Sequence, residues 1–208
     1  MDKELIKDYL NFIDNIKTTK CLPEKYPEDF LYGHYKVIDY YKKNICYSLL
    51  TRQFIDALYD LLNDSKNVIE LYAGKGMISY QLRQKGLEIK AYDNMTWFGN
   101  DDIYTEIIDS DAVDAIKNYK EPIDYCIISW CPYNDPIISK VADALKENNP
   151  NTIIIWIGED YGGCCGSDEF FEKCYAVQDE DFYNKIYETN AFPSFLGYHD
   201  FVYLYKVI

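Results

Sequence analysis

The feature that most constrains the fold is a set of short, mainly apolar runs that alternate with segments of helical period. The runs cover residues 68–72, 123–129 and 152–157. Strands that are apolar along their length are typical of parallel sheets whose two faces are both covered by helices. The sequence therefore predicts an α/β fold built on a doubly wound, mainly parallel sheet.

Further helices are predicted from apolar spacing and from capping residues. Helical spacing marks residues 2–16, two stretches within 35–63, residues 77–85 and residues 112–119. Another helix is expected after Asp135, which suits an N-cap because Pro136 follows at the first helical position.

The end of the chain has a different pattern. Strand-like spacing marks residues 88–92 and, more weakly, 103–108. Two more strand-like segments, 182–189 and 200–207, lie on either side of the turn F-P-S-F-L-G, with no helical pattern between them. Strands joined in this way usually pair in antiparallel fashion. We therefore expect an antiparallel pair at the C-terminal edge of the sheet.

The domain organisation follows from length and from the absence of linkers. The 208 residues contain no internal repeat and no linker-like stretch, so a single domain is expected. Residues 1–66 are predicted to form a helical N-terminal cap that is integral to the domain, and residues 67–208 to form the sheet domain.

The charge balance disfavours two classes of partner. Acidic residues outnumber basic ones by 35 to 21, which gives a net charge of −14. This charge opposes attraction to nucleic acids and to anionic membranes. No apolar run approaches the ~20 residues needed to cross a bilayer, and the first ten residues are too charged for a signal peptide. We expect a cytoplasmic protein with no membrane partner, and nucleic acid is a disfavoured substrate.

The cysteines suggest neither a disulfide framework nor a metal site. There are seven, with no C-x-x-C pair, and the only histidines are His34 and His199. Structural zinc sites usually need four Cys or His ligands at regular spacing. We expect reduced thiols and no bound metal.

A glycine turn is the main indication of a ligand. Gly74 and Gly76 follow the first apolar run, and the first strand-to-helix turn of a doubly wound sheet lies where ligands bind. The chain lacks the G-x-x-x-x-G-K-[ST] pattern of a phosphate-binding P-loop. The dinucleotide pattern G-x-G-x-x-G/A fits at two positions but meets Ser79 at the third, where a larger side chain loosens helix packing.

The turn resembles that of class I S-adenosylmethionine-dependent methyltransferases, typically E/D-x-G-x-G-x-G. Glu70, Gly74 and Gly76 match this pattern, and Asp93 ends the next predicted strand, where an acidic residue takes the ribose hydroxyls. One position departs from it, because Tyr72 replaces the first glycine. The resemblance implies a Rossmann-like fold and S-adenosylmethionine as the cofactor.

Two longer motifs extend the resemblance to most of the chain, from about residue 32 to residue 205. These are S-W-C-P-Y-N-D-P at 129–136 and W-I-G-E-D-Y-G-G-C-C-G-S-D-E-F-F at 156–171. They are similar to the S/C-W-P-P-Y-x-D-P and V-G-E-G-x-G-G-C-T-x-D-D-x-F-F motifs of an uncharacterised methyltransferase-like group. That group implies a cofactor and does not identify a substrate.

The resemblance implies a set of cofactor-binding residues. They are Glu70, Tyr72, Ala73, Gly74, Gly76, Asp93, Asn94, Asp109, Ser110, Asp111 and Ser129. Four of these have a purely structural alternative. Asp93 could be a solvated loop residue, Glu70 could only orient the turn, and Ser110 or Asp111 could cap the helix that begins at Ala112.

The methyl acceptor is expected beside residues 129–133. This segment resembles the D/N/S-P-P-Y/F/W motif of amino-group methyltransferases, but Trp130 occupies the polar position and Cys131 replaces a proline. Trp130, Cys131, Pro132 and Tyr133 could instead form an apolar substrate pocket. Tyr133 and Glu159 are the catalytic candidates, with Glu159 as a general base or simply an acidic loop residue. The glycines at 162, 163 and 166 suggest a mobile loop.

Four functions remain open at this stage. The first is a methyltransferase acting on a small-molecule acceptor. The second is a non-catalytic relative that keeps the fold as a binding or regulatory module. The third is an amino-group methyltransferase acting on nucleic acid or protein, and the fourth is a nicotinamide-dependent oxidoreductase. The acceptor and the oligomeric state are not indicated by the sequence.

Overall fold

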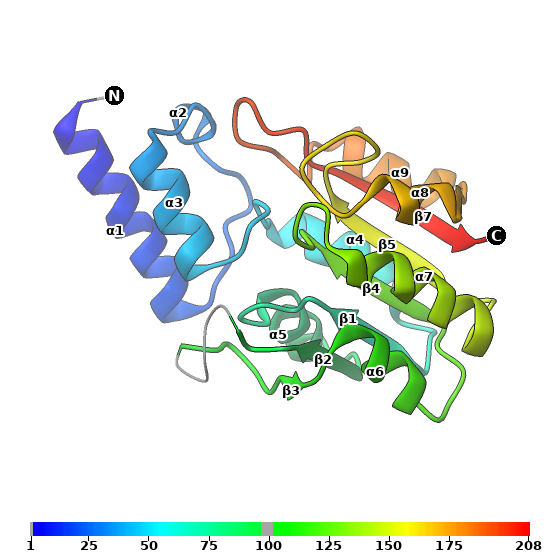
Figure 1. Ribbon diagram of the computed structural model, residues 1–208. Coiled ribbons are helices and arrows are strands. Elements are labelled where there is room, and N and C mark those ends of the chain that lie inside the picture. The colour runs from blue at the N-terminus through cyan, green and yellow to red at the C-terminus, as the bar shows by residue number, and fades with distance from the viewer. Residues whose placement is uncertain (1, 97–101) are drawn as a thin grey trace.

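A seven-stranded sheet is the centre of the molecule, as the computed structural model describes it for residues 2–96 and 102–208 (Figure 1). The strand order is β3-β2-β1-β4-β5-β7-β6. The strands are β1 (Val68–Leu71), β2 (Ile89–Asp93), β3 (Ile108–Asp109), β4 (Tyr125–Ser129), β5 (Ile153–Gly158), β6 (Cys174–Ala176) and β7 (Phe201–Val207). Strands β1 to β5 pair in parallel, and β7 is antiparallel to both β5 and β6. The predicted fold class is confirmed.

Helices cover both faces of the sheet. The helices are α1 (Lys3–Thr19), α2 (Glu28–Leu31), α3 (Tyr35–Asn44), α4 (Arg52–Leu62), α5 (Met77–Gln84), α6 (Ala112–Asn118), α7 (Pro136–Asn148), α8 (Asp168–Glu172) and α9 (Glu180–Tyr187). Side chains of α4, α5 and α9 share one hydrophobic core, and those of α6, α7 and α8 share another.

Strand β5 shows why the apolar runs are continuous. Ile155 and Ile157 belong to the first core, whereas Ile154 and Trp156 belong to the second. Successive side chains of a strand point to opposite faces, so a strand buried on both sides must be apolar at every position.

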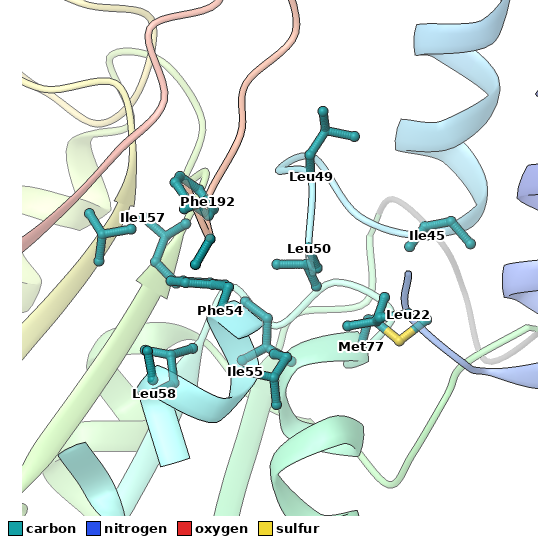
Figure 2. Packing of buried hydrophobic residues seen from close by; sticks show 14 of the residues in the cluster. Leu22, Ile45, Leu49, Leu50, Phe54, Ile55, Leu58, Met77, Ile157 and Phe192 are labelled. Carbon is teal, nitrogen blue, oxygen red and sulfur yellow. The ribbon is translucent and has the colours of Figure 1, made fainter. Parts of the chain in front are cut away.

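The N-terminal helices α1, α2 and α3 lie beyond one end of the sheet (Figure 1). Figure 2 shows Ile45 and Leu50, which follow α3, near Met77 of α5, and all three belong to the same core. In the same view Phe54 of α4 lies beside Phe192, with ring centres 4.5 Å apart. One hydrophobic cluster therefore runs from the N-terminal helices to one face of the sheet.

Two predicted strands are wrong, one in large part and one entirely. Of residues 103–108, only Ile108 lies in a strand, which is β3 (Ile108–Asp109). Residues 182–189 were expected to form a strand but lie in α9, and the partner of β7 is instead β6. Phe182 and Ile186 are four residues apart and both buried, which is helical spacing. Asp179 caps the helix by accepting a hydrogen bond from the Phe182 N–H over 2.9 Å. The cap and the spacing outweigh the strand preference of the aromatic residues.

Capping residues place the other helices as expected. Asp135 accepts from the Ile137 N–H over 2.9 Å, with Pro136 in the first turn of α7. Asp111, rather than Ser110, caps α6 by accepting from the Val113 N–H over 2.9 Å. These caps fix the points at which two helices leave the edge of the sheet where the parallel strands end.

Candidate functional site

A cavity of about 340 Å³ opens at the carboxyl ends of β1, β2 and β4 and beside the start of α6. Lys42, Ile45, Cys46 and Tyr47 from the N-terminal region complete its wall. Most of the residues predicted to bind the cofactor or the substrate line it. They are Glu70, Tyr72, Ala73, Gly74, Asp93, Asn94, Ser110, Asp111, Ser129, Trp130, Cys131, Pro132 and Tyr133. Of the predicted residues, Gly76, Asp109 and Glu159 lie outside this lining.

The glycine turn is built from alternating left-handed residues. Tyr72 has φ 55°, Gly74 φ 55° and Gly76 φ 76°. A bulky residue with positive φ is an outlier, because its Cβ crowds the backbone. Tyr72 thus adopts a conformation that would suit a glycine at the same position. Its hydroxyl donates to Asp135 Oδ2 over 3.1 Å, which fixes the ring against the start of α7.

Gly76 has a packing role. A Cβ at this position would come within 3.0 Å of Thr105 Cγ2 and 3.3 Å of Ile107 Cδ1. Only a glycine allows the segment before β3 to approach the turn this closely. Gly76 therefore shapes the site from behind the cavity wall.

Asp93 joins β2 to the glycine turn. Its Oδ2 accepts from the Gly74 N–H over 2.8 Å, and its Oδ1 accepts from the Met95 N–H over 2.9 Å. Burial raises the pKa of Asp93, while these two hydrogen bonds oppose the shift. A carboxylate has about four acceptor positions, so this one can still bind a ligand hydroxyl on each oxygen.

Glu70 is buried at the end of β1 and has a partner on α5. Its Oε2 accepts from the Ser79 N–H over 3.1 Å and also from the Ser79 hydroxyl. Burial raises the pKa of Glu70 to about 7, against the effect of these hydrogen bonds. Ser79, which breaks the dinucleotide pattern, is thus the residue that ties this acid to the helix.

Three polar residues at the ends of β2 and β3 differ in their position relative to the cavity. Asn94 lines the cavity, and its Oδ1 accepts from the Thr96 N–H over 3.2 Å. Ser110 also lines the cavity, next to the cap residue Asp111. Asp109 pairs in register with Asp93 but is exposed and outside the lining. Of these two aligned carboxylates, only Asp93 lines the cavity.

The turn after β4 is held by β5 and by the loop that contains Gly162, Gly163 and Gly166. The Trp130 N–H donates to the Ile157 carbonyl over 2.9 Å, and the Asn134 N–H donates to the Gly166 carbonyl over 2.7 Å. Burial raises the pKa of Cys131 well above its usual value, so this residue is a thiol in the cavity wall. Tyr133 lies at the mouth, with 63% of its surface exposed.

Glu159 has a different environment from the one expected of a general base. Its Oε2 accepts from the Cys164 N–H over 2.6 Å, and its Oε1 accepts from the His199 N–H over 3.2 Å. Burial opposes ionisation, but these backbone donors lower the pKa of Glu159 overall. Glu159 therefore joins two loops and lies outside the cavity lining, and its role as a general base stays a prediction.

Two glycines of this loop, Gly163 and Gly166, allow close packing. A Cβ on Gly163 would lie 2.6 Å from Glu159 Cβ, and one on Gly166 would lie 2.7 Å from the Trp156 ring. Real Cβ atoms do not approach other atoms so closely. A Cβ on Gly162, by contrast, would meet nothing within 4 Å, and the mobility of this loop stays a prediction.

Comparison with known proteins gives a likeness in fold. No protein-family model matches the chain, and no curated protein matches it. Among solved structures, a SAM-dependent methyltransferase from Archaeoglobus fulgidus has 14% identity over 73% of this chain and 94% of its own, with a TM-score of 0.45. A SAM-dependent methyltransferase from Geobacter sulfurreducens, in complex with S-adenosyl-L-homocysteine, has 12% identity over 67% and 72%, with a TM-score of 0.41.

A third similar structure spans nearly the whole chain. It is a TDP-rhamnose 3'-O-methyltransferase of calicheamicin biosynthesis, with 12% identity over 99% of this chain and 96% of its own and a TM-score of 0.48. With identities of 12–14% and TM-scores below 0.5, these similarities assign neither a function nor residue roles to the chain.

The described residues hold neither a candidate metal site nor a helix that could span a membrane. Within residues 2–96 and 102–208, no group of three or more His, Cys, Asp or Glu side chains is arranged to hold a metal ion. In the same ranges, no helix is both long and apolar enough to span a membrane.

Sequence reasoning missed one group at the end of the cavity. The ammonium of Lys42 lies over the rings of Tyr198, Trp130 and Tyr47, at 3.9, 4.9 and 5.2 Å from the ring centres. The four residues come from three distant parts of the chain, so no local motif could have indicated that they meet.

Proposed function

We propose that this cavity binds S-adenosylmethionine and that the protein is a methyltransferase acting on a small-molecule acceptor. The hydrogen bond from the Gly74 N–H to Asp93 carries this proposal. It joins the two parts of the cofactor motif across one cavity, at the carboxyl edge of a parallel sheet, where ligands of doubly wound folds bind.

The residues around the cavity divide into two sets under this proposal. Asp93 and Asn94 would hold the ribose, and Ser110 or Asp111 would contact the adenine. The glycine turn would let the backbone approach the rest of the cofactor. Trp130, Pro132 and Tyr133 would lie beside the acceptor. The cofactor supplies the methyl group when bound, and the chain's residues orient the reactants and exclude water.

A small acceptor suits the enclosure and the charge. The N-terminal segment from Lys42 to Tyr47 closes one side of the cavity, which leaves about 340 Å³. A net charge of −14 opposes approach of a nucleic acid. Both observations favour a small acceptor over a polymeric one.

The test is a calorimetric titration with S-adenosylhomocysteine. We expect binding to the wild type, and a loss of about tenfold or more for Asp93→Ala, since a hydrogen bond to a charged group contributes about 1.5–3 kcal/mol. Asp109→Ala is the matched control, because Asp109 pairs with Asp93 in register but lies outside the cavity lining. Folded wild-type protein that binds no S-adenosylhomocysteine overturns the proposal.

A non-catalytic relative of the same fold is the second candidate. Tyr72 favours it, because its ring occupies the cavity wall where the methyltransferase motif has a glycine. Cofactor binding without turnover of any methyl acceptor would support this alternative. Competition by NAD would instead support an oxidoreductase.

A further inference from the structure

Three aromatic rings surround one ammonium group at the end of the cavity. We call Tyr47, Trp130 and Tyr198 the aromatic cage. The ring centres of Tyr47 and Trp130 are 5.6 Å apart, and those of Trp130 and Tyr198 are 6.1 Å apart. The ammonium of Lys42 lies within 5.2 Å of all three centres. A cation over several ring faces is attracted by their quadrupoles.

The cage is assembled from three parts of the fold. Lys42 is in the last turn of α3, and Tyr47 lies in the segment that runs from the N-terminal helices toward α4 (Figure 1). Trp130 directly follows β4, and Tyr198 precedes β7. Lys42, Tyr47 and Trp130 also line the proposed cofactor cavity. The cage therefore lies on the side where an acceptor would approach.

The contacts of Lys42 are unusual for a lysine. Within the part of the chain that the structure describes, its ammonium donates no hydrogen bond and forms no salt bridge, and it lies over three aromatic rings. An ordinary ammonium has three N–H groups that need acceptors. A site that offers rings in place of acceptors suits a cation with few or no N–H groups, such as a methylated ammonium.

A negative charge lies close to the cage. Asp200 is buried, with 7% of its surface exposed, and its electrostatic neighbours include Lys42 and Trp130. Glu159, which is ionised, is another neighbour of Asp200. The carboxylate of Asp200 beside Trp130 favours a positively charged ligand over a neutral one of the same shape.

The Lys42 side chain can be displaced from the aromatic cage by a ligand. A lysine side chain loses about 2 kcal/mol of rotamer entropy when it is held in one position, and its ammonium is strongly hydrated. A methylated ammonium has a weaker hydration shell and a larger contact surface with the rings. Such a ligand can displace the lysine side chain, which is only partly buried and can turn toward solvent.

We propose that Lys42 stands in for a methylated ammonium group, and that this group enters the aromatic cage when the lysine side chain turns out. That this group belongs to the methyl acceptor or its product rests on the proposed function. The cage itself is a binding site that does not require the cofactor.

The experiment uses choline and its neutral isostere, 3,3-dimethyl-1-butanol, as probes in calorimetric titrations. We expect Lys42→Ala to bind choline at least about tenfold more tightly than the wild type, because the internal occupant is gone. Lys43→Ala is the matched control, since it removes the neighbouring charge of the same helix. Adding Trp130→Leu to Lys42→Ala should abolish the gain, and the neutral isostere should bind none of the variants.

Several results would overturn the inference. They are equal choline affinity of Lys42→Ala and wild type, an equal gain in Lys43→Ala, or equal binding of the neutral isostere. Thermal unfolding of each variant verifies that it is folded. Because the choline titrations are made both without and with saturating S-adenosylhomocysteine, failure of the cage and failure of the cofactor site are seen separately.

Discussion

The Ser79 N–H donates to Glu70 Oε2 over 3.1 Å, so the acid at the end of β1 is bound to the first turn of α5. Burial raises the pKa of Glu70 from 4.5 to about 7. Because the folded state binds the Glu70 proton more tightly than the unfolded state does, the contribution of Glu70 to stability is fully present below pH 4.5. This contribution is lost as the pH rises through 7.

Replacing Glu70 by glutamine should therefore change the pH dependence of stability. We expect the wild type to lose on the order of 2–3 kcal/mol more than Glu70→Gln between pH 5 and pH 8, at about 1.36 kcal/mol per pKa unit. Urea unfolding at both pH values measures the difference. Asp200 also has a raised pKa, but it is present in both proteins, so it cancels. Parallel pH profiles would contradict the expected ionisation of Glu70.

Removal of the Ser79 hydroxyl should destabilise the protein, and more so at high pH. Ser79→Ala deletes one donor to a buried carboxylate, and an unsatisfied buried group costs about 1–3 kcal/mol. The loss should be larger at pH 8, where Glu70 is ionised, than at pH 5. Unfolding of Ser79→Ala in the Glu70→Gln background is the control, since no charge is then left unpaired. An equal loss at the two pH values would argue against a coupled pair.

Gly166 and Gly197 offer a matched test of close packing. Both have positive φ, at 64° and 85°, but a Cβ on Gly166 would meet the Trp156 ring at 2.7 Å, whereas one on Gly197 meets nothing within 4 Å. Gly197→Ala should lose only about 1 kcal/mol of left-handed strain. Gly166→Ala should lose a further 1–3 kcal/mol, roughly, from overpacking. Similar melting temperatures for the two variants would show that the loop yields easily.

The sequence predicted those parts of the molecule that depend on local pattern. Apolar runs, caps such as Asp135, and the glycine turn are read from neighbouring residues, and each has its physical cause within a few positions. Residues 182–189 were misjudged because their aromatic content suits a strand, while the spacing of Phe182 and Ile186 makes them a helix.

The site likewise has parts that the sequence predicts and parts that it does not. The turn residues and Asp93 meet at one cavity because parallel strands end at a common edge, which topology alone requires. The aromatic cage depends instead on side chains that are far apart in the sequence, such as Lys42 and Tyr198. Tyr72 could be recognised only as a departure from a motif, since its left-handed backbone and its hydrogen bond to Asp135 are properties of the folded chain.

The hydroxyl of Tyr72 gives a prediction about the cavity wall. Tyr72→Phe keeps the ring but removes the donor to Asp135, whose charge makes the hydrogen bond worth about 1.5–3 kcal/mol. Urea unfolding should show a loss of this order at neutral pH. Tyr133→Phe is the control, because Tyr133 lines the same cavity but is mostly exposed. Equal stability of Tyr72→Phe and wild type would show that solvent replaces the bond.

Protonation of Asp200 should weaken cation binding in the aromatic cage. Burial raises the pKa of Asp200 to about 6, while the Trp130 side chain, the charge of Lys42 and the Ser194 side chain lower it and the charge of Glu159 raises it. The carboxylate is ionised only above this pKa, so choline affinity should rise with pH. In Lys42→Ala the midpoint should lie above pH 6, because the lysine charge that lowers the pKa of Asp200 has been removed.

The measurement is choline titration of Lys42→Ala at several pH values between 5 and 8. Asp200→Asn in the same background should bind choline more weakly at pH 8 and show little dependence on pH. The bound cation should also lower the pKa of Asp200, so binding near the midpoint should release protons, which calorimetry in buffers of different ionisation enthalpy detects. A pH profile that is unchanged by Asp200→Asn would assign the titration to another group, and Asp200 would then have no part in holding the cation.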